Sequence, residues 1–266
     1  MPPASAMSAY LLPILYTVFV WWFATGVILY LNGLPRWTFK WTMAGATVLL
    51  VLALAGLQAT AHSTRIGAAY SAFTCAILVW AWQEVAFLLG WVTGPRRSNC
   101  PPGATGWRRA GFALEAVLHH EMALVLLAGA VAAVTWGGVN QTGMWTFLVL
   151  WIMRQSAKLN IFLGARNLNE SFLPAHLKYL QTYFTRKAMN PLFPFSVLLS
   201  SLVAWWLWQA TGADGVTPFM LTSLTFAAML LSLAVLEHWF LVLPLPSEAL
   251  WAWGLRSRVA SPAKSL

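Results

Sequence analysis

The chain has 266 residues, of which 59% are hydrophobic and only 9% are charged. Soluble domains carry about 25% charged residues, so this composition excludes an ordinary soluble domain and indicates a polytopic membrane protein. The net charge of +9 would suit a nucleic-acid-binding protein. The basic residues fall in short loops between apolar stretches, however, so they indicate membrane orientation, and we expect no nucleic-acid partner. Cys75 and Cys100 form no disulfide framework and have no metal-binding spacing.

Long apolar stretches follow one another along the whole chain, and a membrane-spanning helix needs roughly 20 mainly apolar residues. Seven stretches meet this requirement: residues 9–31, 41–61, 66–92, 109–135, 142–164, 194–211 and 217–243. The first stretch has no basic segment before it and is long enough to span, so it predicts a membrane helix and not a signal peptide. The sequence therefore predicts one all-α domain over residues 1–266, a polytopic bundle of about seven transmembrane helices.

Two of the connections between these stretches are long. Residues 93–108 are rich in Pro, Gly and Arg and predict an irregular loop. Within residues 165–193, apolar side chains recur on one side of a short segment with rough helical spacing. They are Leu177, Leu180, Tyr183 and Phe184. This pattern predicts either an amphipathic helix in the membrane interface or a docked loop.

The basic residues lie almost entirely on one side of this predicted topology. Arg65 alone falls on the opposite side, and Arg154 and Lys158 fall inside the fifth span. The other thirteen are Arg36, Lys40, Arg96, Arg97, Arg108, Arg109, Arg166, Lys178, Arg186, Lys187, Arg256, Arg258 and Lys264. Because positive charge stays in the cytoplasm, we expect a periplasmic N-terminus, a cytoplasmic C-terminus and an odd number of spans.

Nine ionisable side chains lie inside the predicted spans. They are Glu84, Glu115, His119, His120, Glu121, Arg154, Lys158, Glu237 and His238. A charged group at the bilayer centre costs about 2.5–3.5 kcal/mol on insertion scales, so such groups mark a functional site by default. At about 1.5 Å per residue, all nine lie at depths of about 10–20 Å. We therefore expect them to form one shared polar centre.

These residue types leave three interpretations of the centre open. In the first, Arg154 and Lys158 share one helix face and neutralise buried carboxylates in a salt-bridge and hydrogen-bond network. In the second, acids and histidines bind a metal ion, although the Glu-x-x-His spacing of di-iron bundles is absent. In the third, His119, His120 or His238 is an axial ligand of haem or a chlorophyll. The candidates for metal or tetrapyrrole binding are Glu84, Glu115, His119, His120, Glu121, Glu237 and His238.

Catalytic motifs of soluble enzymes do not occur in the sequence. There is no phosphate-binding loop, dinucleotide-binding motif, nucleophile elbow or paired-cysteine motif. The sequence therefore assigns no catalytic residue and favours a role other than catalysis.

Several long segments resemble one family of membrane proteins. They are EVAFLLGWVTGPRRSNCPPGATGW, LHHE, the stretch from NQTGMWTF to LKYLQTYF, MNPLFP and LEHWFLVLPLPSEALWAW. Together they resemble the photosynthetic complex assembly protein 2 family (PuhE type) of purple photosynthetic bacteria, over nearly the whole chain. This resemblance implies a multi-pass protein of the bacterial inner (cytoplasmic or intracytoplasmic) membrane. It also implies a role in assembling the reaction centre and core light-harvesting antenna, and in bacteriochlorophyll production.

The resemblance also bears on partners and cofactors. It implies contacts with reaction-centre or light-harvesting subunits, or with pigment-synthesis enzymes, and it supplies no catalytic residues. The alternative is an intramembrane oxidase or hydroxylase that acts on a pigment or lipid and uses a metal ion, bacteriochlorophyll or haem.

Overall fold

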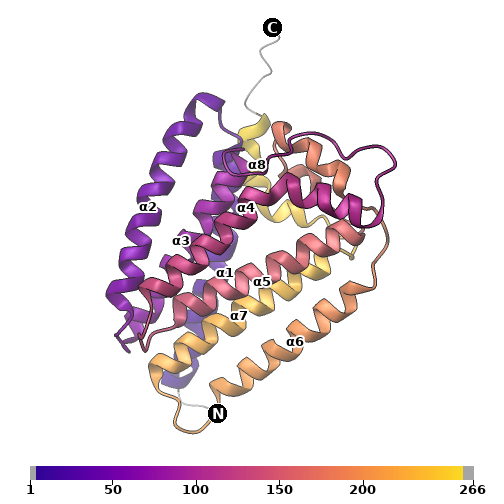
Figure 1. Ribbon diagram of the computed structural model, residues 1–266. Coiled ribbons are helices and arrows are strands. Elements are labelled where there is room, and N and C mark those ends of the chain that lie inside the picture. Colours follow the sequence, from indigo (N-terminus) through magenta and orange to yellow (C-terminus); the bar gives the residue numbers. More distant parts are fainter. Residues whose placement is uncertain (1–3, 260–266) are drawn as a thin grey trace.

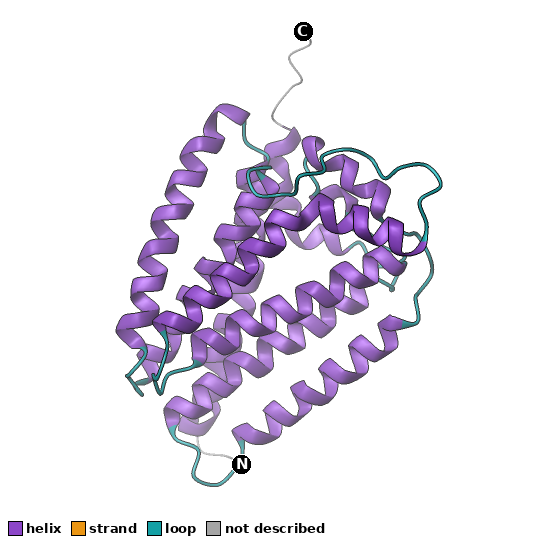
Figure 2. Ribbon diagram, in the orientation of Figure 1, coloured by secondary structure: helices purple, strands orange, loops and turns teal. Residues whose placement is uncertain are grey.

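The computed structural model describes residues 4–259, and long helices make up most of it (Figure 2). In chain order they are α1 (Ala4–Asn32), α2 (Phe39–Thr60), α3 (Ile66–Leu88), α4 (Gly106–Val134), α5 (Thr142–Leu163), α6 (Leu192–Thr211) and α7 (Pro218–Phe240). Short 3₁₀ segments and one terminal helix complete the described chain: η1 (Arg36–Thr38), η2 (Glu170–Phe172), η3 (Ala175–Tyr183), η4 (Ser247–Trp251) and α8 (Ala252–Val259). The predicted all-α architecture is confirmed.

Six of the long helices are long and apolar enough to cross a membrane: α1, α2 with η1, α3, α4, α6 and α7. The exception is α5, which has 22 residues but carries Arg154, Gln155, Lys158 and Asn160 in its second half. The predicted third and seventh spans were too long, because α3 ends at Leu88 and α7 ends at Phe240. The multi-pass character of the chain thus follows from apolar helices within the described residues.

The connections between the long helices gather at two opposite ends of the bundle (Figure 1). One end, called the basic end here, holds residues 33–38, 89–105, 164–191 and 241–259. Long-range hydrogen bonds join these segments to the adjacent helix ends, as from Arg109 Nη2 of α4 to Tyr183 O (2.5 Å) and from Arg258 Nη2 to Asn32 Oδ1 of α1 (2.6 Å). At the opposite end Asn140 N donates to Ala61 O (2.9 Å). Lys264, assigned from sequence to the basic side, lies outside the described residues.

Helix α3 is the most buried of the long helices and forms the centre of the bundle. On one side its residues pack with α2, α4 and α5 around Leu57, Leu124 and Phe147. On another side Phe73 stacks on Phe226 of α7, with ring centroids 4.4 Å apart. A polar residue on α3 is therefore held in the interior of the protein.

The segment that follows α7 returns along α1. Trp251 Nε1 donates to Trp22 O (3.0 Å), and Ser257 Oγ donates to Tyr30 O (2.8 Å). The two backbones approach closely where Gly254 crosses Gly26, since a Cβ on Gly254 would lie 2.4 Å from Gly26 O. This glycine crossing fixes α8 against α1 at the basic end.

The second long connection is docked on the bundle. Its 3₁₀ helix η3 buries Leu177, Leu180 and Tyr183 against residues of α3 and α4, including Phe87 and Ala116. The predicted apolar side is thus correct, but it is covered by protein. Of the two interpretations, the docked loop describes this segment.

Candidate functional site

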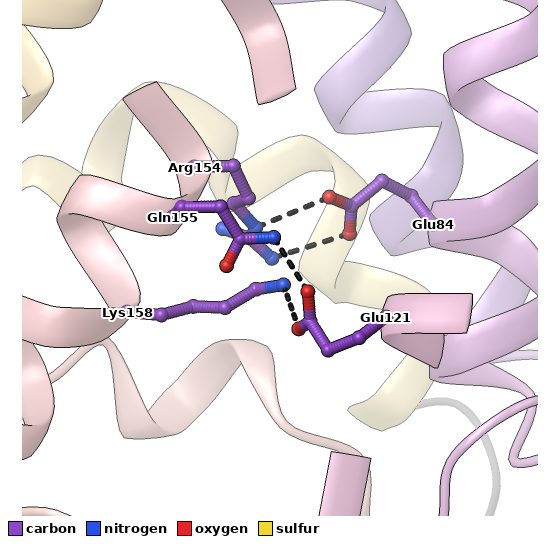
Figure 3. Close-up of polar contacts among 5 residues, drawn as sticks. All are labelled: Glu84, Glu121, Arg154, Gln155 and Lys158. Atoms are coloured by element: carbon purple, nitrogen blue, oxygen red, sulfur yellow. Dashed lines mark hydrogen bonds and ion pairs between the residues drawn. The ribbon is translucent and has the colours of Figure 1, made fainter. Parts of the chain in front are cut away.

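A two-pronged ion pair joins α3 to α5 inside the bundle. Arg154 Nε lies 3.2 Å from Glu84 Oε1, and Arg154 Nη2 lies 3.2 Å from Glu84 Oε2 (Figure 3). Such a paired geometry is stronger and more directional than a single contact. The Glu84 side chain is 11% exposed, whereas the Arg154 side chain is 44% exposed. The carboxylate is therefore enclosed by the protein, and the guanidinium remains accessible.

A second ion pair joins α4 to α5 one turn further along. Lys158 Nζ lies 2.6 Å from Glu121 Oε1, and Gln155 Nε2 donates to Glu121 Oε2 (2.5 Å). Figure 3 shows that all three α5 side chains point toward the two glutamates. We call these five residues (Glu84, Glu121, Arg154, Gln155 and Lys158) the ion-pair layer. Its two acids and two bases balance, which is what buried charges in a membrane require.

Other polar side chains of α5 form hydrogen bonds with further helices and with the loop before α6. Ser156 Oγ lies 2.9 Å from His238 Nε2 of α7. Asn160 Nδ2 donates to Ser196 Oγ of α6 (3.1 Å), and Asn190 Nδ2 donates to Asn160 Oδ1 (3.0 Å). Residues 154–160 cover nearly two helical turns, so their side chains point all round the axis. This explains why the least apolar long helix lies among α3, α4, α6 and α7.

The adjacent residues Glu237 and His238 point in different directions, as consecutive residues of a helix must. His238 is 1% exposed, and its Nδ1 lies 2.8 Å from Ala234 O. A carbonyl oxygen can only accept, so Nδ1 carries the proton and Nε2 accepts from Ser156. Glu237 lies on an exposed part of α7, where Oε1 accepts from Trp21 Nε1 (2.7 Å). Both ring nitrogens of His238 are therefore already used.

The remaining candidates lie on α4. Glu115 and His119 are exposed on the outer side of this helix, and Glu115 Oε2 lies 3.9 Å from Arg96 Nη1. His120 is 1% exposed, and its ring lies against that of Phe87 with centroids 4.5 Å apart.

The structure thus brings four of the nine sequence candidates together and links a fifth to the same helix. Glu84, Glu121, Arg154 and Lys158 meet directly, and His238 joins α5 through Ser156. Glu115, His119 and Glu237 form no ion pair or hydrogen bond with these residues in the described chain, although Glu237 is close enough to the layer to interact electrostatically with Arg154 and Glu84. Sequence reasoning missed the neutral partners Gln155, Ser156, Asn160 and Trp21. The first three could have been recognised as polar residues spaced around one predicted span.

The geometry bears on metal and tetrapyrrole binding. Within residues 4–259, no three His, Cys, Asp or Glu side chains gather as a metal site would need. Each glutamate of the ion-pair layer faces a cation. Of the three histidine candidates, His120 is enclosed by protein, and both ring nitrogens of His238 are hydrogen-bonded. His119 is exposed, so its ring is the one of the three that an external ligand can reach.

A groove of about 440 Å³ opens between α5 and α6 beside this site. Its lining is formed by Trp151, Ile152, Gln155, Ser156, Leu159, Leu192 and Ser196. The walls are mainly apolar, and the polar members are those that connect α5 to its neighbours. Its volume lies within the range of about 300–1,000 Å³ typical of small-molecule sites.

The fold and the ion-pair layer together define a multi-pass helical membrane protein with paired internal charges. The chain belongs to the family described as "Protein of unknown function (DUF3623)", which matches residues 7–261. It is also 39% identical over 258 residues to a Rhodobacter capsulatus protein called "Uncharacterized 30.4 kDa protein in puhA 5'region". That similarity covers 95% of this chain and 93% of the relative. No solved structure matches the chain.

Proposed function

We propose that this protein is a membrane factor that assists or regulates assembly of the bacterial photosynthetic reaction centre and core antenna, and thereby influences bacteriochlorophyll production. The observation that carries the proposal is the relative from the puhA region of a photosynthesis gene cluster, similar over nearly its whole length. The resemblance of the long sequence segments to a photosynthetic assembly family supports the same role. We place the protein in the bacterial inner membrane on the same grounds.

The outer surface of the bundle suits a protein that meets other membrane helices. Outward residues of α2, such as Val48 and Leu52, and of α6, such as Phe195 and Trp206, are large, apolar and exposed. Meanwhile the charges of the ion-pair layer are satisfied internally. The partners we propose are reaction-centre or light-harvesting subunits, or enzymes of pigment synthesis.

We further propose that all seven long helices cross the membrane, with the N-terminus in the periplasm. Helix α5 is not apolar enough to span a membrane by itself. Its polar groups bond to side chains of α3, α4, α6 and α7, however, so their hydrogen-bonding capacity is met by protein. The described basic residues of the connections lie at one end of the bundle except Arg65, and the positive-inside rule assigns that end to the cytoplasm.

Deletion of the gene in a photosynthetic host tests the proposed role. We expect lower amounts of assembled core complex and of bacteriochlorophyll, restored by the wild-type gene on a plasmid. Absorption spectra of membranes and native-gel quantification of core complexes provide the measurement. Unchanged pigment and assembly kinetics under all photosynthetic growth conditions would contradict the proposal.

A second candidate is a tetrapyrrole- or metal-dependent enzyme acting on a pigment or lipid. Two observations favour it: the open side of His119, and the groove between α5 and α6. Optical spectra and metal analysis of protein purified without chelators test this function. A tetrapyrrole band that disappears in His119→Ala but persists in His62→Ala would support it, and the absence of both pigment and metal would rule it out.

A further inference from the structure

Four polar side chains beside the ion-pair layer or in the basic end carry buried atoms that have no hydrogen-bond partner among the described residues. They are Gln83 through both amide atoms, Thr93 through Oγ1, His120 through Nδ1 and Tyr179 through its phenol oxygen. Gln83, Thr93 and His120 are each 1% exposed. Buried polar groups in native proteins are nearly always paired, so four unpaired groups in one region require an explanation.

The four side chains come from α3, the first long loop, α4 and η3, and these elements pack together in one cluster. Gln83 lies one turn before Phe87 on the same side of α3, and the Phe87 ring contacts His120. The backbone N–H of His120 donates to Thr93 O (2.9 Å). The Tyr179 phenol of η3 lies close enough to the Thr93 hydroxyl to interact with it, but neither oxygen has a partner at hydrogen-bond geometry. The series therefore runs from the last third of α3 to the docked segment at the basic end.

This series lies directly behind the ion-pair layer. Gln83 precedes Glu84, and His120 precedes Glu121. Neighbouring residues of a helix point about 100° apart. The two glutamates reach α5. Gln83 and His120 are both buried, and the His120 ring lies against Phe87 of α3. The charged layer and the neutral series are thus two adjoining parts of one polar region.

We propose that ordered water molecules bind along the series Gln83, His120, Thr93 and Tyr179 and form a hydrogen-bonded path from the ion-pair layer to the basic end. The chemistry of the groups fits water, which donates and accepts at once. Gln83 offers a donor and an acceptor, and the two hydroxyls and the imidazole can each act as either. A buried water typically makes about three such bonds. The path lets protons exchange between the interior and the aqueous phase at the basic end.

Water-edited solid-state NMR of the full-length protein in lipid bilayers tests this proposal, with ¹⁵N-labelled histidine and glutamine side chains. His238 is the matched control, because it is equally buried but has both ring nitrogens bonded directly to protein. We expect polarisation from water to reach the His120 ring and the Gln83 amide several-fold faster than the His238 ring. Equal, slow transfer to both rings would overturn the proposal.

A mutational test asks whether substitutions in the series raise or lower the Tm of the protein. If water binds the series, Gln83→Met and Thr93→Val each remove a partner of that water and lower the Tm, and Gln83→Met also slows the transfer of polarisation to His120. If the groups are unsatisfied and dry, both substitutions raise the Tm, which overturns the proposal. Thr225→Val is the control, since the buried Thr225 hydroxyl donates to Leu221 O of its own helix. Should a variant fail to fold, the measurement on the wild-type protein still decides.

Discussion

At the scale of single residues, the charges of the ion-pair layer depend on one another. In Arg154→Leu, the enclosed Glu84 carboxylate loses the one cation that it contacts directly among the described residues. Breaking a fully buried pair costs about 3–5 kcal/mol. Since the Arg154 side chain is 44% exposed, we expect a smaller loss of about 1–3 kcal/mol. The yield and Tm of the purified protein in detergent measure this loss.

Two further variants separate this effect from a general loss of charge. Glu84→Gln in the Arg154→Leu background removes the stranded carboxylate and should restore part of the stability. Lys178→Leu removes a cation from the exposed side of η3 and should leave the Tm within experimental error. A double variant that is no more stable than Arg154→Leu would refute the pairing.

A second residue prediction concerns pH and His176 at the basic end. Its Nε2 donates to Leu88 O (3.0 Å), and burial, together with the nearby Arg36 charge, lowers the pKa of the His176 imidazole below 6.5. The unfolded chain then binds a proton more readily than the folded protein, so the stability contributed above pH 6.5 is lost as the pH falls from 6.5 toward the folded pKa. Melting curves between pH 8 and pH 5 should show a loss of Tm that is smaller in His176→Asn. An identical pH dependence in both proteins would contradict this assignment.

The charged residues of the site could be predicted from sequence, whereas their partners could not. Arg154 and Lys158 share a helix face by spacing alone, and depth along the helices brought both to the level of Glu84 and Glu121. The side on which each residue lies depends on how α3, α4 and α5 are rotated against one another. A single sequence does not fix those rotations, so it could not show that Glu115, His119 and Glu237 form no ion pair or hydrogen bond with the ion-pair layer in the described chain.

At the scale of elements, the first long loop is fixed to α4 by a glycine. A Cβ on Gly94 would lie 2.1 Å from the Glu115 carbonyl oxygen, so Gly94→Ala forces the loop away from the helix. We expect a destabilisation of about 1–3 kcal/mol, as for other overpacked sites. Gly111 of α4 is the matched control, because a Cβ there meets no atom within 4 Å. Gly111→Ala should instead stabilise the helix by about 0.5–1 kcal/mol. Thermal melts of the two variants should therefore shift in opposite directions.

The long membrane helices are easier to predict from the sequence than the short helices η3 and α8. The bilayer demands a long apolar run, so the apolar runs indicated every long helix to within a few residues at most ends. The docked 3₁₀ helix η3 and the return of α8 along α1 depend on local contacts, such as the crossing of Gly26 and Gly254. Small residues at a crossing leave no periodic signal, and α8 was accordingly not predicted.

At the scale of the whole molecule, we predict that α5 crosses the membrane together with the six apolar helices. Reporter fusions after residues 63, 139 and 214 should read periplasmic, and fusions after residues 100, 180 and about 260 should read cytoplasmic. Paired reporters that are active on opposite sides, such as alkaline phosphatase and green fluorescent protein, measure this in cells.

The fusions after residues 139 and 180 decide between the two arrangements, because they flank α5. With α5 spanning, they report opposite sides. With only the six apolar helices spanning, they report the same side, and the fusions after residues 180, 214 and 260 all reverse. The basic connections 164–191 and 241–259 would then face the periplasm, away from Arg96 and Arg109. The structure joins these connections at one end, since Arg109 bonds Tyr183 O and Arg258 bonds Asn32. A six-span protein could not make those contacts across a bilayer, so we expect opposite sides for residues 139 and 180.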